Sequence, residues 1–157
     1  MKIALFQPDI ADNVGAVLRL GACMAVPVEI IEPCGFPFDM RRIRRVALDY
    51  IDHVKLRRHA SWDAFQAESD ARGSRLVLLS TRGRLRYDEF AFAPTDTLLF
   101  GRESAGVPDA VHDASDAVLR VPLAREMRSL NVASASAMVL GEALRQTGLL
   151  PGDENER

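Results

Sequence analysis

Short apolar segments recur along the chain between stretches in which apolar and polar residues are mixed. Several of these segments are apolar at almost every position, which is typical of strands that are buried on both faces of a sheet. Each segment is bounded by Pro, Gly, Asp or Ser, the residues that commonly end strands. The pattern therefore predicts six strands, over residues 3–6, 28–31, 54–56, 76–79, 98–100 and 118–121.

Apolar residues at helical spacing predict five helices between these strands, over residues 13–25, 40–48, 62–71, 109–114 and 131–146. Asn13, Asp39, Ser61 and Asn131 stand where N-cap residues are expected, and Gly148 stands where the last helix should end. Strand and helix alternate without a break in composition. The sequence thus predicts one α/β domain around a mostly parallel sheet over residues 1–150, followed by a polar tail over 151–157.

Composition narrows the class of protein. The chain has 157 residues, of which 48% are hydrophobic, and a formal net charge of -2, which fits one globular domain. Cys23 and Cys34 form neither a disulfide framework nor a zinc-binding pattern, and no metal site is expected. No apolar run approaches the roughly 18 residues of a membrane helix, and no secretory leader is recognisable. We therefore expect a cytoplasmic protein without a membrane segment.

Three loops follow predicted strands at the edge of the sheet where parallel folds bind their ligands. They cover residues 7–15, 100–108 and 121–131. In the first, Gly15 and Arg19 share a helix face, and the small Gly could leave room for a nucleotide or phosphate beside the Arg. The alternative is that the stem of Arg19 simply covers the edge of the core.

The other two loops also leave two interpretations open. Gly101 and Gly106 flank charged residues, which is typical either of a loop shaped around a ligand or of a solvent-exposed turn. The third loop is longer than most strand-to-helix connections. It ends at Asn131, which could take part in a site or merely cap the last helix. None of the common hydrolase, zinc or phosphate-binding signatures is present.

Positive charge is concentrated over residues 41–58, although the whole chain is slightly acidic. Seven cations in this segment face Asp49 and Asp52 alone: Arg41, Arg42, Arg44, Arg45, Lys55, Arg57 and Arg58. Arginine suits bidentate contact with phosphates, so the segment is a candidate nucleic-acid surface. Aromatic residues make up only 6% of the chain, which argues against a base-stacking platform for single strands.

Taken together, five motifs in register resemble the SPOUT class of RNA methyltransferases. The likeness is greatest to the small TrmL-type tRNA 2′-O-methyltransferases, which act at the anticodon wobble nucleotide, and it covers residues 1–147. The motifs are Asn13-x-Gly15-x-x-x-Arg19, Ile30-Ile31-Glu32-Pro33-Cys34-Gly35-Phe36, Arg44-Arg45-x-x-Leu48-Asp49-Tyr50, Phe100-Gly101-x-Glu103-x-x-Gly106-x-Pro108 and Pro122-x-x-x-x-x-Arg128-Ser129-Leu130-Asn131.

The resemblance implies a C-terminal trefoil knot, a homodimer, and transfer of a methyl group from S-adenosylmethionine to the ribose of cytidine or carboxymethylaminomethyl-uridine at position 34 of tRNA. It implies catalytic roles for Arg19 and Asn13, and ordering of the two knot loops by Glu103 and Asn131. The implied cofactor-binding residues are Leu79, Gly101, Val121, Ser129 and Leu130. The surface expected to bind RNA contains Arg41, Arg42, Arg45 and Arg128.

The sequence departs from the TrmL-type pattern in loops that would meet RNA or the second subunit. The departures are Ala11-Asp12, Arg102, Ala105, Ala133-Ser134 and Gly141. One alternative is therefore a ribose methyltransferase of the same class acting at another tRNA or rRNA site, or an RNA-binding relative without activity. A flavodoxin-like mononucleotide-binding module is the alternative from another class. A receiver-like signalling domain is disfavoured, because Arg57-Arg58 and Gly101-Arg102 occupy the positions of its Asp and Lys.

Overall fold

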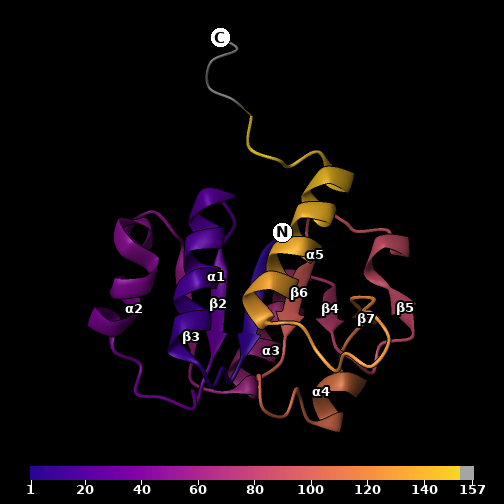
Figure 1. Ribbon diagram of the computed structural model, residues 1–157, viewed down its shortest axis with the longest axis horizontal. Coiled ribbons are helices and arrows are strands. Elements are labelled where there is room, and N and C mark those ends of the chain that lie inside the picture. The colour runs from indigo at the N-terminus through magenta and orange to yellow at the C-terminus, as the bar shows by residue number, and fades with distance from the viewer. Residues whose placement is uncertain (153–157) are drawn as a thin grey trace.

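In the computed structural model, seven strands form one sheet in the order β3-β2-β1-β6-β4-β7-β5 (Figure 1). The structure describes residues 1–152, except for the side chain of Arg42, so most of the predicted tail at 151–157 lies outside the described residues. Every neighbouring pair of strands is parallel. The strands are β1 (Lys2–Phe6), β2 (Val28–Ile31), β3 (Leu56–His59), β4 (Leu76–Leu79), β5 (Leu85–Arg86), β6 (Thr97–Phe100) and β7 (Ala117–Arg120).

Helices cover both faces of this sheet. On one face lie α1 (Ala11–Cys23), α2 (Met40–Ala47) and α5 (Val132–Thr147), and on the other lie α3 (Trp62–Arg72) and α4 (Asp109–Asp113). Two short 3₁₀ helices, η1 (Leu48–Asp52) and η2 (Tyr87–Glu89), complete the described elements. The predicted α/β class with a parallel sheet is confirmed.

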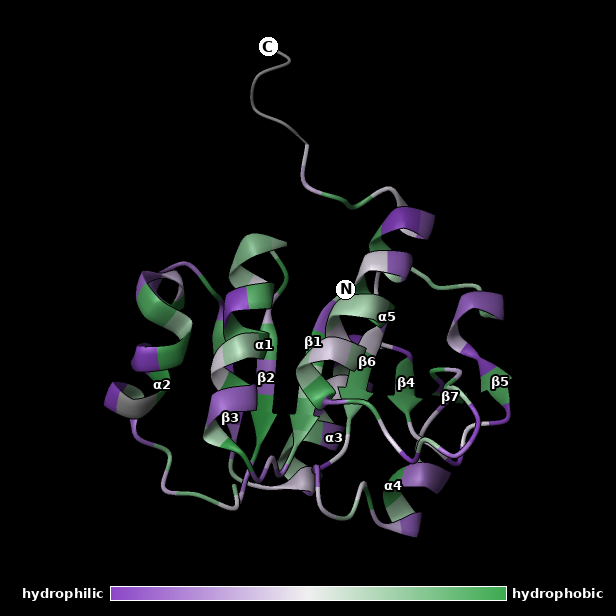
Figure 2. Ribbon diagram, viewed as in Figure 1, coloured by the Kyte–Doolittle hydropathy of each residue, from purple (hydrophilic) through white to green (hydrophobic). Residues whose placement is uncertain are grey.

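Successive residues of a central strand enter the two halves of the core alternately. Ile3 and Leu5 of β1 pack in the cluster beneath α1, α2 and α5, whereas Ala4 and Phe6 pack in the cluster beneath α3 and α4. Because both sides are buried, these strands are apolar at most positions, as the hydropathy colouring shows (Figure 2). This two-sided burial is why the central strands were recognisable from the sequence.

The edge strands differ from their prediction. The strand expected at 54–56 runs instead from Leu56 to His59, and its middle residues Arg57 and Arg58 are exposed. An edge strand pairs on one side only, so it tolerates charged side chains that hide it from a search for apolar runs. Strand β5 has two residues, Leu85–Arg86, and was not predicted.

Most predicted helix ends are confirmed, with one exception. The side chains of Asp39, Ser61 and Asn131 each accept a backbone N–H in the first turn of their helices. Gly148, with φ of 67°, ends α5. The prediction for Asn13 is wrong: α1 begins at Ala11, two residues earlier, and no side chain caps it. Asn13 is thereby free to point away from its own helix.

The parallel arrangement places the carboxyl ends of the central strands side by side. Phe100 at the end of β6 is in register with Leu5 of β1 and with Leu79 of β4, and Leu79 is in register with Leu119 of β7. The three candidate loops therefore leave the sheet along one edge. The trefoil knot stays a prediction. No helix among the described residues is long and apolar enough to cross a membrane.

Candidate functional site

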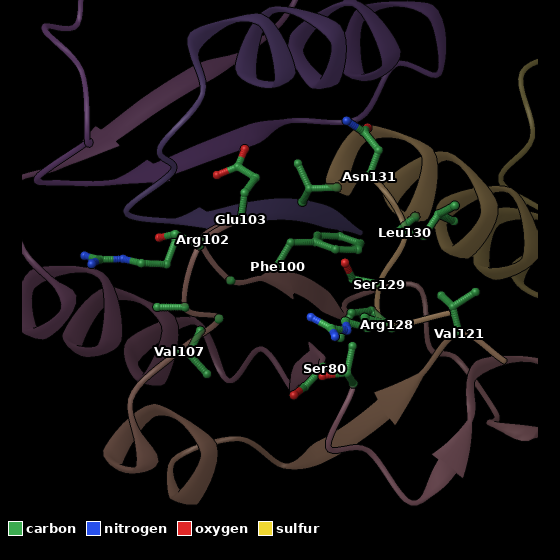
Figure 3. Close-up of a pocket in the computed structure, with 18 of the residues that line it drawn as sticks. Ser80, Phe100, Arg102, Glu103, Val107, Val121, Arg128, Ser129, Leu130 and Asn131 are labelled. Carbon is green, nitrogen blue, oxygen red and sulfur yellow. The ribbon is translucent and has the colours of Figure 1, made fainter. Parts of the chain in front are cut away.

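A cavity of about 580 Å³ opens at the carboxyl edge of β4, β6 and β7. Its wall is built by the segments that follow these strands, together with the start of α1 and the start of α5, and Figure 3 shows side chains from these segments around it. All five residues that the sequence assigned to the cofactor line this one cavity: Leu79, Gly101, Val121, Ser129 and Leu130. Residues 79 and 130 are far apart in sequence, so the fold alone brings them together.

Two glycines shape the loop after β6. A Cβ atom built on Gly101 would lie 2.6–2.9 Å from the carbonyl carbon, Cα and oxygen of Gly106, which is too close for any side chain. The loop closes through two hydrogen bonds between the backbones of Arg102 and Gly106, at 3.0 and 2.8 Å. Gly106 itself has φ of 64°, a conformation that favours glycine. The spacing of the two glycines thus reflects a direct contact between two backbone segments.

A chain of hydrogen bonds joins the three predicted loops. The Asn131 amide donates to Oδ1 of Asn13 at 2.9 Å, and the Asn13 amide donates to Oε1 of Glu103 at 2.9 Å. The second oxygen of Glu103 accepts the backbone N–H of Asp9 at 2.8 Å. Oδ1 of Asn131 also accepts the N–H groups that begin α5. Asn13, Glu103 and Asn131 therefore tie the start of α1, the loop after β6 and the start of α5 to one another.

The loop after β1 makes further contacts with the loop after β6. The Ser104 hydroxyl and backbone N–H donate to the Asp9 carboxylate, and the hydrogen bond from the hydroxyl lowers the pKa of Asp9. The Arg102 guanidinium donates to the side chain of Gln7. Arg102, one of the departures from the TrmL-type pattern, is thus held by the neighbouring loop while it lines the cavity.

The far wall of the cavity contains residues that were not predicted from the sequence. Ser80, Thr81 and Arg82 follow β4 directly and line the cavity. Arg82 forms an ion pair with Asp109 at 2.8 Å, and the Ser80 hydroxyl lies 3.4 Å from Nε2 of His112. Their position immediately after a predicted strand would have identified them, because it places them at the same sheet edge as the other three loops.

Arg19 lies outside the cavity. It is exposed on α1, and its guanidinium carbon stands 4.7 Å from the centre of the Tyr50 ring. The expected open space at Gly15 is wrong: a Cβ built there would lie 2.6 Å from Cβ of Val46, so α2 occupies the space beside this glycine. Gly15 allows two helices to approach closely and leaves no room for a ligand.

The basic segment is less positive at the surface than its sequence indicates. Arg44 pairs with Asp52, Arg57 with Glu68 and Arg58 with Glu32. The last two acids lie outside residues 41–58, so a count along the sequence could not include them. Arg41 and Arg45 are exposed on α2 and form no ion pair within the described part of the chain. The side chain of Arg42 is not among those that the structure describes. Arg128 is separate from this surface and lies at the cavity.

The geometry is that of an α/β protein with a small-molecule cavity bordered by RNA-methyltransferase motifs, and sequence comparison specifies it further. The chain belongs to the SpoU rRNA methylase family, whose model matches residues 1–141. The resemblance to SPOUT-class enzymes is thereby confirmed. Membership in this family sets aside the flavodoxin-like and receiver-like interpretations.

Individual relatives agree with this membership. A protein of Beijerinckia indica named tRNA (cytidine(34)-2′-O)-methyltransferase is 57% identical over 148 residues, which cover 94% of this chain and 92% of the relative. A solved structure concerned with 2-OH methylation of C/U34 on tRNA superimposes with a TM-score of 0.87 at 39% identity, covering 92% of this chain and 94% of that one. An AdoMet-bound rRNA methyltransferase from Sinorhizobium meliloti matches at 25% identity with a TM-score of 0.83, covering 92% of this chain and 55% of its own.

Proposed function

We propose that this protein transfers the methyl group of S-adenosylmethionine to the ribose 2′-hydroxyl of nucleotide 34 of tRNA, with cytidine or carboxymethylaminomethyl-uridine as the base. The observation that carries the proposal is the convergence of three motif-bearing loops on one cavity at the carboxyl edge of the sheet. The relatives named for this reaction at position 34 share the chain over more than nine-tenths of its length.

The cavity has the size and lining that the cofactor needs. Its volume of about 580 Å³ lies within the range of small-molecule sites. Apolar side chains such as Leu79, Val121 and Leu130 offer a surface for the adenine ring, and the hydroxyls of Ser80 and Ser129 offer hydrogen bonds. Bound S-adenosylmethionine supplies an activated methyl group on a sulfonium. The residues of the chain then have to position the ribose and favour loss of the proton of its 2′-hydroxyl.

The 2′-hydroxyl would pass its proton to solvent water as its oxygen bonds to the methyl carbon, and the bond between that carbon and the sulfonium sulfur would break to release S-adenosylhomocysteine. Glu103 is the acidic side chain among the described residues that line the cavity, and both of its oxygens already accept hydrogen bonds. Glu103 therefore orders the loops and does not act as the base. An arginine is protonated at neutral pH, so Arg19 acts by stabilising the negative charge that develops on the ribose oxygen. Asn13 holds the loops at this position and keeps one N–H for the ribose.

The position of Arg19 supports a homodimer, which the resemblance to SPOUT-class enzymes implies. Within one chain Arg19 is directed toward Tyr50 and does not line the cavity, so a single chain does not bring it to the methyl group. The loop after β7 and α5 expose four large apolar side chains, as expected of a surface that a second copy covers: Leu123, Met127, Leu130 and Met138. In the proposed dimer, Arg19 of one subunit serves the cavity of the other.

Substrate tRNA lies across the exposed arginines. Arg41, Arg42 and Arg45 on α2 contact its phosphates, and Arg128 contacts the RNA at the mouth of the cavity. Residues 1–150 form the methyltransferase domain of each subunit. The reaction takes place in the cytoplasm, where tRNA and the cofactor are both available.

The test is a methyl-transfer assay with labelled S-adenosylmethionine and tRNA from cells that lack the enzyme, followed by mapping of the modified nucleotide. We expect a 2′-O-methyl group at position 34. Arg19→Ala should lower the rate by about 100-fold or more, the usual cost of removing a group that stabilises a developing oxyanion. Arg86→Ala is the matched control, because Arg86 is a half-buried arginine paired with Asp88 away from the cavity.

Each result bears on a different part of the proposal. A methyl group at another nucleotide would contradict the position and keep the reaction. Absence of transfer in the wild-type protein, under conditions where the cofactor binds, would contradict the reaction. An active Arg19→Ala variant would contradict the role of Arg19.

A further inference from the structure

Arg19 contacts Tyr50, the last residue of the third motif, to which the resemblance assigns no role. Its guanidinium carbon lies 4.7 Å from the centre of the Tyr50 ring, at the distance of a cation–π contact. Arg19 is exposed, and in the described part of the chain no hydrogen bond or ion pair holds its guanidinium. A long side chain on an exposed helix face normally samples many rotamers. The ring is thus the feature that gives this guanidinium a preferred position.

The turn that carries Tyr50 is anchored on both sides of this residue. Tyr50 lies in η1, in which the next residue, Ile51, is 6% exposed and belongs to the core. Asp52 accepts two hydrogen bonds from the Arg44 guanidinium, both at 2.8 Å. Leu48, at the start of η1, has φ of 55° and ψ of -147°, a conformation that non-glycine residues rarely adopt. The chain therefore accepts backbone strain at the turn that presents Tyr50.

The close packing of α1 and α2 brings this turn to Arg19. Gly15 and Arg19 lie one turn apart on the same face of α1, and at Gly15 the end of α2 approaches to a distance that no side chain would allow. Since η1 follows α2 directly, the approach at Gly15 sets η1 beside Arg19. The placement of the Arg19 guanidinium thus depends on Gly15, on the strained Leu48 and on Tyr50.

We propose that Tyr50 is a positioning residue for the methyl transfer, which holds the Arg19 guanidinium in the orientation that meets the ribose. The inference rests on the proposed function, in which Arg19 stabilises charge on the ribose oxygen. A cation–π contact ties the guanidinium to no hydrogen-bond acceptor of another side chain, so its N–H groups stay available to the substrate. The contact also preserves the charge of Arg19, which a hydrogen-bonded carboxylate would have neutralised.

The test compares Tyr50→Leu, which removes the ring, with Tyr50→Phe, which keeps it. Tyr50→Leu should lower kcat by about fivefold, the upper value for an exposed cation–π interaction, with the KM for S-adenosylmethionine and the melting temperature nearly unchanged. Tyr50→Phe should stay within about twofold of wild type. Phe90→Leu is the matched control, because it removes a cation–π pair of the same length, Arg75 over Phe90 at 4.7 Å, outside the site.

A double-variant comparison shows whether Tyr50 acts through Arg19. In an Arg19→Ala background, Tyr50→Leu should cause no further decrease of the remaining rate. A second readout is independent of activity: the side-chain N–H resonance of Arg19 should carry a ring-current shift that Tyr50→Leu abolishes and Tyr50→Phe preserves.

Three results would overturn the inference while the wild-type protein still methylates nucleotide 34. These are full activity of Tyr50→Leu, equal decreases in Tyr50→Leu and Tyr50→Phe, and an undiminished effect of Tyr50→Leu in the Arg19→Ala background. Failure of the proposed function is distinguishable, because the wild-type protein would then place no methyl group on the tRNA. That result would remove the role of Tyr50 in methyl transfer as well, whatever the resonance shows.

Discussion

At the scale of single residues, the cavity depends on a backbone contact that no side chain can enter. An added Cβ at Gly101 would lie 2.6 Å from the carbonyl carbon of Gly106, and backbone atoms cannot move aside as the end of a flexible side chain can. We expect Gly101→Ala to open the loop, to weaken S-adenosylmethionine binding by about tenfold or more, and to lower the free energy of unfolding by about 1–3 kcal/mol. Calorimetric titration and urea denaturation measure the two effects.

Gly152→Ala serves as the control for this substitution, because a Cβ built at Gly152 meets nothing within 4 Å. Unchanged cofactor affinity in Gly101→Ala would show that the loop can close around a larger residue. The contact between the glycines would then not be what shapes the cavity.

Asn13 shows what the sequence could not reveal about a single residue. Its place before an apolar helical pattern suggested that it caps a helix, but α1 begins at Ala11 and the partner of the Asn13 amide is Glu103, 90 residues further along. A local pattern contains only local partners, so capping was the one role it could suggest. The five residues expected at the cofactor came from the resemblance to SPOUT-class enzymes, and all of them line one cavity. The sheet-edge rule for parallel folds predicted only the region in which they lie, because it requires no knowledge of distant contacts.

At the scale of elements, the same contrast separates central from edge strands. Strands β1, β2, β4 and β6 are buried at nearly every position, so an apolar run identifies them. Strand β3 carries two exposed arginines and β5 has only two residues, so neither has an apolar run to detect. Strands β3 and β5 form because their backbones pair with those of the neighbouring strands β2 and β7.

Helix α2 is the element on which tRNA binding is expected to depend. Replacing Arg41, Arg42 and Arg45 together by Gln should weaken tRNA binding and reduce the slope of log K against log salt by up to about 2–3, roughly 0.7–0.9 for each phosphate that is no longer neutralised. Filter binding at several salt concentrations measures both quantities. Arg44→Gln is the matched control on the same helix, because Arg44 already pairs with Asp52 at 2.8 Å. A triple variant with the slope of the wild-type protein would place the RNA on another surface.

At the scale of the whole molecule, one buried carboxylate links three parts of the fold. Glu29 of β2 is 3% exposed, accepts hydrogen bonds from Arg72 of α3 at 3.0 and 3.2 Å, and lies 3.4 Å from Nζ of Lys2 and 3.1 Å from Nε2 of His59. Burial raises the pKa of Glu29, but the hydrogen bonds and charge of Arg72, with Lys2 and His59, outweigh burial and lower it below 4.5.

Because the pKa of Glu29 is lower in the folded than in the unfolded chain, its stabilisation is complete above about pH 4.5 and is lost as the pH falls further. Glu29→Gln should therefore be less stable at pH 7 by about 2–4 kcal/mol, and its stability should fall less steeply under acid conditions. Urea denaturation between about pH 7 and pH 3 gives both values. The exposed Glu126→Gln is the control, and equal acid slopes for Glu29→Gln and wild type would contradict the expectation.

In the proposed dimer, Arg19 of one subunit serves the cavity of the other, and two inactive variants test this arrangement. Arg19→Ala keeps a sound cavity, whereas Gly101→Val keeps Arg19 and loses cofactor binding. If Arg19 serves the cavity of the partner, a mixed dimer contains one complete site, formed by the cavity of the first variant and the Arg19 of the second. Random co-assembly should then restore about a quarter of the wild-type activity from two proteins that are each inactive alone. If Arg19 serves its own cavity, both sites of the mixed dimer are defective and the mixture stays inactive, which would contradict the dimeric site while leaving the methyl-transfer reaction itself in place.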